Sequence, residues 1–103
     1  MMIIYNVTCN IEDSVFNDWL EWIEEKYLPE IRNRDFFTDI SINELISSKD
    51  LGRTYAIQFK CKSLSILNKY HNIYQNDIEK EHFNRFNSKV VLFSSILQEY
   101  KSF

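Results

Sequence analysis

With 103 residues the chain has room for one domain, which we expect to span residues 1–103. It is 45% hydrophobic and 16% aromatic with one Gly and one Pro, a composition that excludes disordered, collagen-like and linker-rich proteins. Its 15 acidic and 12 basic residues give a net charge of −3 at pH 7, which argues against binding to nucleic acid or to a membrane surface.

The N-terminal residues lack the features of an export signal. Met1–Val7 contains no basic region, long apolar run or cleavage site, and no stretch approaches the roughly 20 apolar residues that span a bilayer. We therefore expect a cytoplasmic protein. Cys9 and Cys61 lack zinc-ligand spacing, so we expect reduced thiols in the core and no metal site, with a single disulfide as the alternative.

The first third of the chain predicts a strand followed by a helix. Residues 2–10 alternate between apolar and polar side chains, which is typical of a half-buried strand. From there to Tyr27 the apolar residues follow a helical period. Asp13 or Ser14 is expected to cap this helix. Pro29 is expected to kink or end it, with Pro29–Arg32 adding a turn.

The remaining chain predicts three strands and a second helical region. The strands are expected at residues 37–46, 53–61 and 90–100. Between the first two of them, Ser47–Gly52 is the clearest turn signal and holds the glycine. Ser63 is expected to cap the second helical region, which is predicted to break near Gln75–Asn76.

This order of elements is the ferredoxin-like βαββαβ pattern of α+β proteins. Right-handed crossovers place both helices on one face of a four-stranded antiparallel sheet, with the first and third strands in the centre. The helix-covered face is expected to take the apolar members of each alternation, namely Ile3, Tyr5, Val7, Ile40, Ile42, Tyr55, Ile57 and Phe59.

The opposite sheet face has a mixed character that predicts a homodimer. Its polar candidates are Asn6, Asp39, Ser41, Gln58 and Lys60. The last strand adds either Val91, Phe93 and Leu97 or Val90, Leu92 and Ile96. Such a face is too apolar to be fully solvated, and pairing with the same face of a second copy covers it. Asp39 and Lys60 are expected to form an ion pair across that interface rather than a catalytic pair.

Several short motifs resemble those of a small bacterial family known as domain of unknown function 4286. They are Met2–Thr8, Trp19-Leu20-x-Trp22, Leu28-Pro29-Glu30, His82-x-x-Arg85-Phe86 and Lys89-x-Val91. The resemblance spans nearly the whole chain, and Tyr27 stands where the family often has His. It implies the dimeric α+β barrel superfamily, which includes small oxygenases, haem-binding proteins, isomerases and regulatory ligand-binding modules.

The candidate pocket residues are aromatic or histidine side chains. They are Trp22, Tyr27, His82, Tyr5 and Tyr55, which we interpret either as a pocket for a small-molecule ligand or as core. His71 and His82 are interpreted as a haem or metal ligand or a general base, or as surface or capping residues. Without a ligand cluster we expect neither metal nor cofactor. Arg53–Phe59 partly resembles the third-strand signature of RNA-recognition motifs. We reject RNA binding, because the orientation of the strand in those motifs would place Lys60 in the core.

Two functional hypotheses follow, since no nucleophile elbow, P-loop or paired carboxylates are visible. The first is a homodimeric binding or regulatory module without dedicated catalytic machinery. The alternative is a small cofactor-free or haem-using oxygenase-like enzyme with a pocket between helices and sheet. The sequence leaves open whether the protein is an enzyme.

Overall fold

The computed structural model describes residues 1–46 and 52–103. The predicted turn at Ser47–Gly52 therefore lies outside the described residues, except for Gly52. The helices and strands follow in the order β1 (Ile3–Ile11), η1 (Asp13–Val15), α1 (Phe16–Trp22), η2 (Ile23–Tyr27), α2 (Leu28–Asn33), β2 (Asp39–Glu44), β3 (Arg53–Cys61), α3 (Leu64–Ile73), α4 (Asp77–Phe86), η3 (Asn87–Lys89) and β4 (Val90–Gln98).

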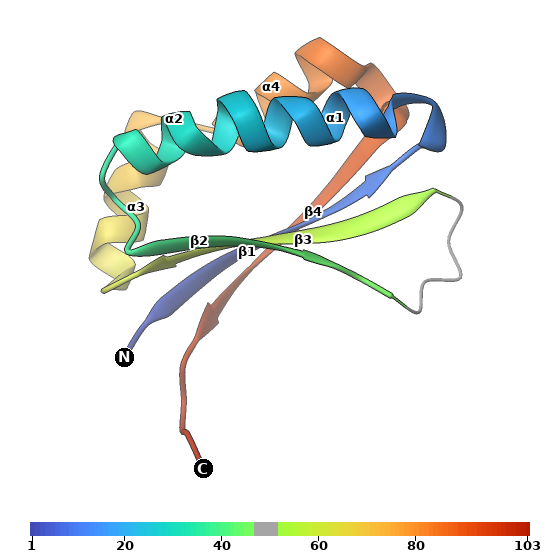
Figure 1. Cartoon of the computed structure of the whole chain (residues 1–103). Coiled ribbons are helices and arrows are strands. Elements are labelled where there is room, and N and C mark those ends of the chain that lie inside the picture. Colours follow the sequence, from blue (N-terminus) through green and yellow to red (C-terminus); the bar gives the residue numbers. More distant parts are fainter. Residues whose placement is uncertain (47–51) are drawn as a thin grey trace.

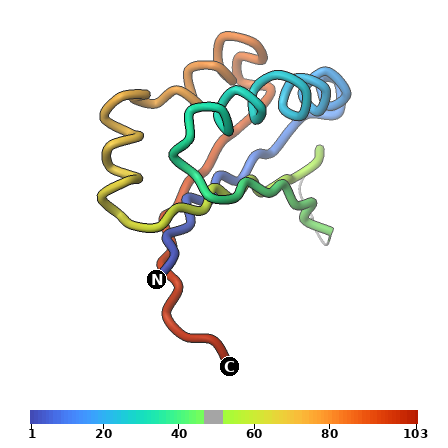
Figure 2. Tube along the Cα trace, turned by 60° about the vertical axis from the view of Figure 1, so that its left-hand side comes forward, coloured from blue at the N-terminus to red at the C-terminus, as the bar shows by residue number. Residues whose placement is uncertain are grey.

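The four strands form an antiparallel sheet in the order β2-β3-β1-β4, so that the first and third strands are central, as predicted. Figure 1 shows all the helices on one side of this sheet, with α1 and α2 in line above it. The rotated view in Figure 2 shows the same two layers and leaves the other sheet face uncovered. This is the α+β, ferredoxin-like architecture that the sequence predicts.

The register of β1 decides which side chains face the helices. Tyr5 pairs with Phe59 of β3 and with Ile96 of β4, so these three side chains share the helix-covered face. Thr8 pairs with Phe93 on the opposite face. The two alternatives for the last strand are thereby resolved, because the open face takes the set Val91, Phe93 and Leu97. Cys9 and Cys61 are fully buried, as predicted.

The segments η1, α1, η2 and α2 follow one another without a break, and we call them the first helical arm. This arm differs from the prediction at its start and at Pro29. Neither Asp13 nor Ser14 caps it; the Val15 N–H donates instead to the Glu12 carbonyl at 3.1 Å in a 3-10 turn. Pro29 does not end it: the π-helical η2 ends at Tyr27, and α2 begins at Leu28 and continues through Pro29 to Asn33, which confirms the turn predicted at Pro29–Arg32. The wider π turn accommodates a residue that lacks an N–H and whose ring collides with a carbonyl in a regular helix.

The second helical region follows its local signals. The Ser63 hydroxyl accepts a hydrogen bond from the Ile66 N–H at 3.2 Å, which confirms the predicted cap. Asn76 adopts a left-handed φ of 53° between α3 and α4, which confirms the predicted break. β2 is shorter than predicted, since the Phe37 ring turns onto Phe59, with 5.2 Å between the ring centroids.

An aromatic core lies between the helices and the sheet. Its fully buried side chains include Trp19, Phe59 and Ile57, with Tyr27 and Trp22 nearly so. Aromatic rings bury large areas, which lets a short chain close a core without a disulfide. Within the described ranges, none of the helices combines the length and the apolar character that crossing a bilayer requires.

Gly52 provides a direct test of the fold at the start of β3. Its φ is +87°, and a Cβ added to it lies 2.4 Å from the Ile11 carbonyl oxygen. Gly52→Ala is therefore expected to lower the free energy of unfolding by about 1–3 kcal/mol in urea denaturation. Asn87→Gly is the matched control, because it places glycine at another left-handed position and relieves strain. An unchanged midpoint for Gly52→Ala contradicts this geometry.

Candidate functional site

The structure brings three of the predicted pocket residues together in the core. Trp22 stacks on Tyr27 with ring centroids 4.8 Å apart, and its edge meets the His82 ring at 4.9 Å. All three are buried. Tyr55 lies apart from them and packs on Phe16 at 5.5 Å, while Tyr5 lines a separate cavity. The five candidates therefore do not surround one space.

His82 is a core histidine, so the expectation of a surface or capping residue is wrong. It is 1% exposed, and its Nε2 accepts a hydrogen bond from Trp19 Nε1–H at 3.0 Å. Its Nδ1 therefore carries the proton and donates to the Ile78 carbonyl at 2.7 Å. Burial lowers the pKa of His82 to about 4, so the ring is neutral at pH 7. With both nitrogens engaged, His82 does not fit the role of a haem ligand.

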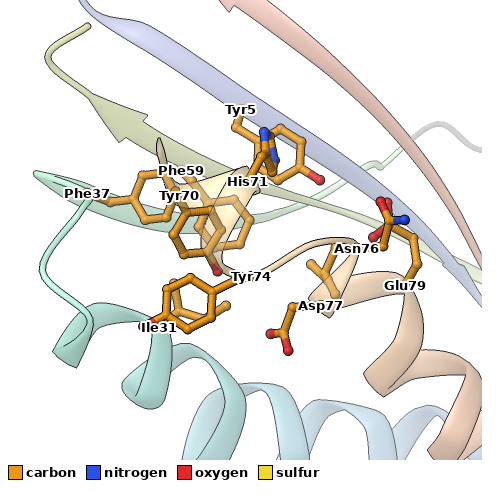
Figure 3. Close-up of a pocket in the computed structure, with 11 residues that line it drawn as sticks. Tyr5, Ile31, Phe37, Phe59, Tyr70, His71, Tyr74, Asn76, Asp77 and Glu79 are labelled. Atoms are coloured by element: carbon orange, nitrogen blue, oxygen red, sulfur yellow. The ribbon is translucent and has the colours of Figure 1, made fainter. Parts of the chain in front are cut away.

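A small cavity of about 40 Å³ lies between the sheet and the α3–α4 corner. Figure 3 shows aromatic rings on most of its wall, with Tyr5 and His71 on one side and Asn76 and Glu79 near the Tyr5 hydroxyl. The full lining comprises Tyr5, Ile31, Phe37, Phe59, Tyr70, His71, Tyr74, Asn76, Asp77, Ile78 and Glu79. This volume holds about two ordered waters or a small apolar group, and is far too small for a haem.

An open groove of about 410 Å³ adjoins this cavity along β4. Four residues line both spaces, namely Tyr5, His71, Asn76 and Glu79. The outer wall of the groove is Ser94–Ile96. The cavity and the groove therefore form one continuous candidate site, which we call the corner groove.

The titratable side chains that line both spaces are uncharged apart from Glu79. Burial, followed by the Glu79 carboxylate, raises the pKa of Tyr5 to about 12. Burial lowers the pKa of His71, and the Glu79 charge opposes that shift. At pH 7 the phenol is thus protonated and the imidazole neutral. The edge-on contact between these two rings, at 4.8 Å, fixes them as one wall.

A polar cluster anchors the other side of the cavity. The Asp77 carboxylate accepts hydrogen bonds from the Tyr27 hydroxyl at 2.8 Å and from Arg34 at 3.1 Å. The same guanidinium donates to the Tyr70 hydroxyl at 3.0 Å and lies 4.0 Å from the Tyr74 ring centroid. Arg34 and Asp77 therefore neutralise each other and hold the start of α4 against the first helical arm.

Sequence reasoning missed most of this site. The sequence pattern singles out neither Tyr70 and Tyr74 nor Glu79 as candidate site residues. The break at Asn76 is the one signal that could have drawn attention to them, since a chain reversal next to a sheet exposes side chains from both helix ends.

The candidate dimer residues all lie on the open sheet face. A polar row crosses its middle from Ser41 through Gln58 and Asn6 to Ser95, with Gln58 Nε2–H donating to Asn6 Oδ1 at 3.4 Å. Lys60 lies directly opposite Asp39 at one end of the face. The exposed apolar residues are Val91, Phe93 and Leu97, of which Phe93 is 73% exposed.

Three solved structures share this fold across nearly their whole length. A dimeric ferredoxin-like protein from an uncultured marine organism aligns with a TM-score of 0.69 and 13% identity over 99% of this chain and 98% of that chain. A candidate antibiotic biosynthesis monooxygenase from Bacillus cereus aligns with a TM-score of 0.66 and 13% identity, covering 99% and 94%. An EthD-like protein from Ralstonia eutropha aligns with a TM-score of 0.65 and 14% identity, covering 94% and 90%.

The sequence itself matches one family model. That model is described as Domain of unknown function (DUF4286), and it covers residues 2–100. No curated protein matches the chain. At 13–14% identity the solved structures establish the ferredoxin-like α+β fold and nothing finer.

The buried His82 predicts a loss of stability in acid. Burial lowers its pKa from the ordinary value of 6.5 to about 4, so between these values the unfolded chain takes up a proton that the folded chain does not. The stabilisation that the neutral His82 provides is fully present above pH 6.5. Toward pH 4 the free energy of unfolding falls by up to roughly 3 kcal/mol. Urea unfolding across this range is expected to show a shallower pH dependence for His82→Gln than for wild type.

The control is His71→Gln, which removes the more exposed histidine and is expected to retain most of the wild-type pH dependence. Equal pH dependences for wild type and His82→Gln contradict a buried neutral histidine.

Proposed function

Because the chain belongs to the family described as Domain of unknown function (DUF4286), whose description names no activity, we propose its function from the geometry. We propose that it is a homodimeric binding or regulatory module that holds a small molecule in the corner groove. Two such subunits pack through their open sheet faces.

The open sheet face is the observation that carries the dimer. Val91, Phe93 and Leu97 stand in a row on β4 with about half or more of their surface exposed. Each such side chain contributes about 1.5–3 kcal/mol when it is fully buried. In a two-fold contact each of these side chains is buried in both copies. Burial of this apolar strip is therefore a strong driving force for association.

The polar half of the same face fits a two-fold contact as well. The row from Ser41 to Ser95 offers hydroxyls and amides that both donate and accept hydrogen bonds, so it is complementary to itself. Asp39 and Lys60 add opposite charges at one end of the face, where an antiparallel partner brings an acid to a base. These groups favour one register over the others that the apolar strip allows.

The dimeric ferredoxin-like protein from a marine organism supports this assembly at the level of fold. Face-to-face packing of two four-stranded sheets covers an area in the range of a standard interface, about 800 Å² per partner.

A binding role fits the corner groove better than catalysis does. Its inner cavity is small and aromatic, and Tyr5 and His71 are held in uncharged forms against each other. Asp77, the other carboxylate on the wall, is occupied by Arg34 and Tyr27. Such a site orients a ligand through shape and a few polar contacts.

One observation favours an oxygenase-like enzyme as the second candidate. His71 is neutral and partly accessible next to the Tyr5 phenol, which is an arrangement that allows a general base to act on a substrate hydroxyl. The likeness in fold to a candidate antibiotic biosynthesis monooxygenase is compatible with this role.

Sedimentation equilibrium tests the dimer directly. We expect a dimer for wild type and a monomer for Phe93→Arg. The substitution would bury one unpaired positive charge from each subunit in the interface. Phe83→Arg on α4 is the matched control, since Phe83 is 64% exposed but lies on the helical layer. A monomeric wild type, or a dimeric Phe93→Arg, contradicts the sheet-to-sheet dimer.

Oxygen consumption with hydroquinone as the probe separates the two functions. The binding proposal predicts that wild type consumes oxygen no faster than His71→Ala. Turnover by wild type that His71→Ala abolishes, with the dimer mass unchanged, replaces the binding proposal with the enzymatic one.

A further inference from the structure

We propose that the corner groove binds a small organic cation, an alkylated ammonium group, with Glu79 as its counter-charge and the Tyr5 and His71 rings as its wall. This inference rests on the proposed binding function and names the class of ligand. Neither the family description nor the similar structures assign a ligand to this place.

The charge balance of the groove is the first argument. Glu79 lines the inner cavity, the groove beside it and a third, shallower hollow on α4, and Lys80 lines that third hollow but not the groove. The Glu79 charge reaches both Tyr5 and His71, and neither supplies a compensating positive charge at pH 7. The groove therefore presents one net negative charge to a ligand, which repels anions and attracts cations.

The guanidinium beside the inner cavity is engaged elsewhere. Arg34 is held by Asp77 and Tyr70 and lies over the Tyr74 ring, on the side of the cavity that faces α2. In Figure 3 Asp77 lies beside Tyr74, whereas Glu79 lies with Asn76 toward the strands. Asp77 is thus engaged by Tyr27 and Arg34, and Glu79 is the carboxylate that the groove offers to a ligand.

Aromatic walls select an organic cation over a metal ion. Ring faces attract a positive charge within about 6 Å, and this attraction suits a weakly hydrated alkylated ammonium better than a strongly hydrated inorganic ion. Arg34 already uses the Tyr74 ring in this way at 4.0 Å. Among the described residues, no group of three or more His, Cys, Asp or Glu side chains could hold a metal ion.

The size of the space limits the ligand. The inner cavity of about 40 Å³ admits a methyl group, and the groove of about 410 Å³ has room for a trimethylammonium head with a short tail. Ser94 lies on the helix-covered face of β4 and lines the outer wall, where its hydroxyl can bond a polar tail. Choline has this combination of a cationic head and a hydroxyl tail and serves as the probe.

Calorimetric titration of the full chain with choline is the test, and 3,3-dimethylbutan-1-ol is the neutral ligand of the same shape. We expect saturable binding of choline, and binding of the neutral alcohol that is weaker by about tenfold or more, because it lacks the charge. Glu79→Gln is expected to weaken choline binding by a similar factor. Glu81→Gln is the matched control, since it removes the same charge from a partly exposed residue of the same helix.

Each remaining outcome counts against the inference. Equal affinity for choline and the alcohol shows an apolar site without charge selection, and equal loss in Glu79→Gln and Glu81→Gln shows only a general charge effect. The oligomeric state of wild type and of both variants is measured by sedimentation equilibrium in the same buffers. A dimer that does not bind choline overturns the ligand class and leaves the dimer standing, whereas a monomer overturns the dimer by itself.

Discussion

The hydrogen bonds that Asp77 accepts determine where the second helical region lies. Asp77 is the first residue of α4, and it ties that helix to Tyr27 and Arg34 on the first helical arm. After the left-handed residue Asn76, this anchor acts together with the buried Ile78, His82 and Phe86 to set the direction of α4. The same contact places Glu79, two residues further on, over the edge of the sheet. The cavity and the groove therefore depend on this charged hydrogen-bond cluster at the first turn of α4.

The sheet divides the molecule into two surfaces with different tasks. On the helix-covered face, Val7, Ile57 and Phe59 are packed by the aromatic core. On the open face, polar side chains from β2 and β3 stand beside the apolar side chains of β4. The exposed apolar side chains of β4 are unfavourable in water. In a two-fold contact they supply apolar burial, while the polar side chains of β2 and β3 supply specificity.

The sequence predicts what is local and misses what the topology assembles. The Ser63 cap, the break at Asn76 and the alternation of β1 are written in neighbouring residues, and all three are confirmed. At Pro29 the predicted turn over Pro29–Arg32 is present as part of α2, whereas the predicted helix end is wrong, because the preceding π turn accommodates the proline without breaking the helical path. His82 stands four residues from Ile78 and from Phe86 on one buried stripe, so the helical period indicated burial where its polarity suggested the surface.

The corner groove lay beyond sequence reasoning for a different reason. Tyr5, His71 and Glu79 come from β1, α3 and α4, and only the antiparallel pairing of β1 with β4 brings them beside Ser94. In the proposed dimer the partner packs against Ser95, on the reverse side of the strand that forms the wall of the groove. The proposed dimer contact and the proposed ligand site therefore use opposite faces of the same edge strand, so that neither blocks the other.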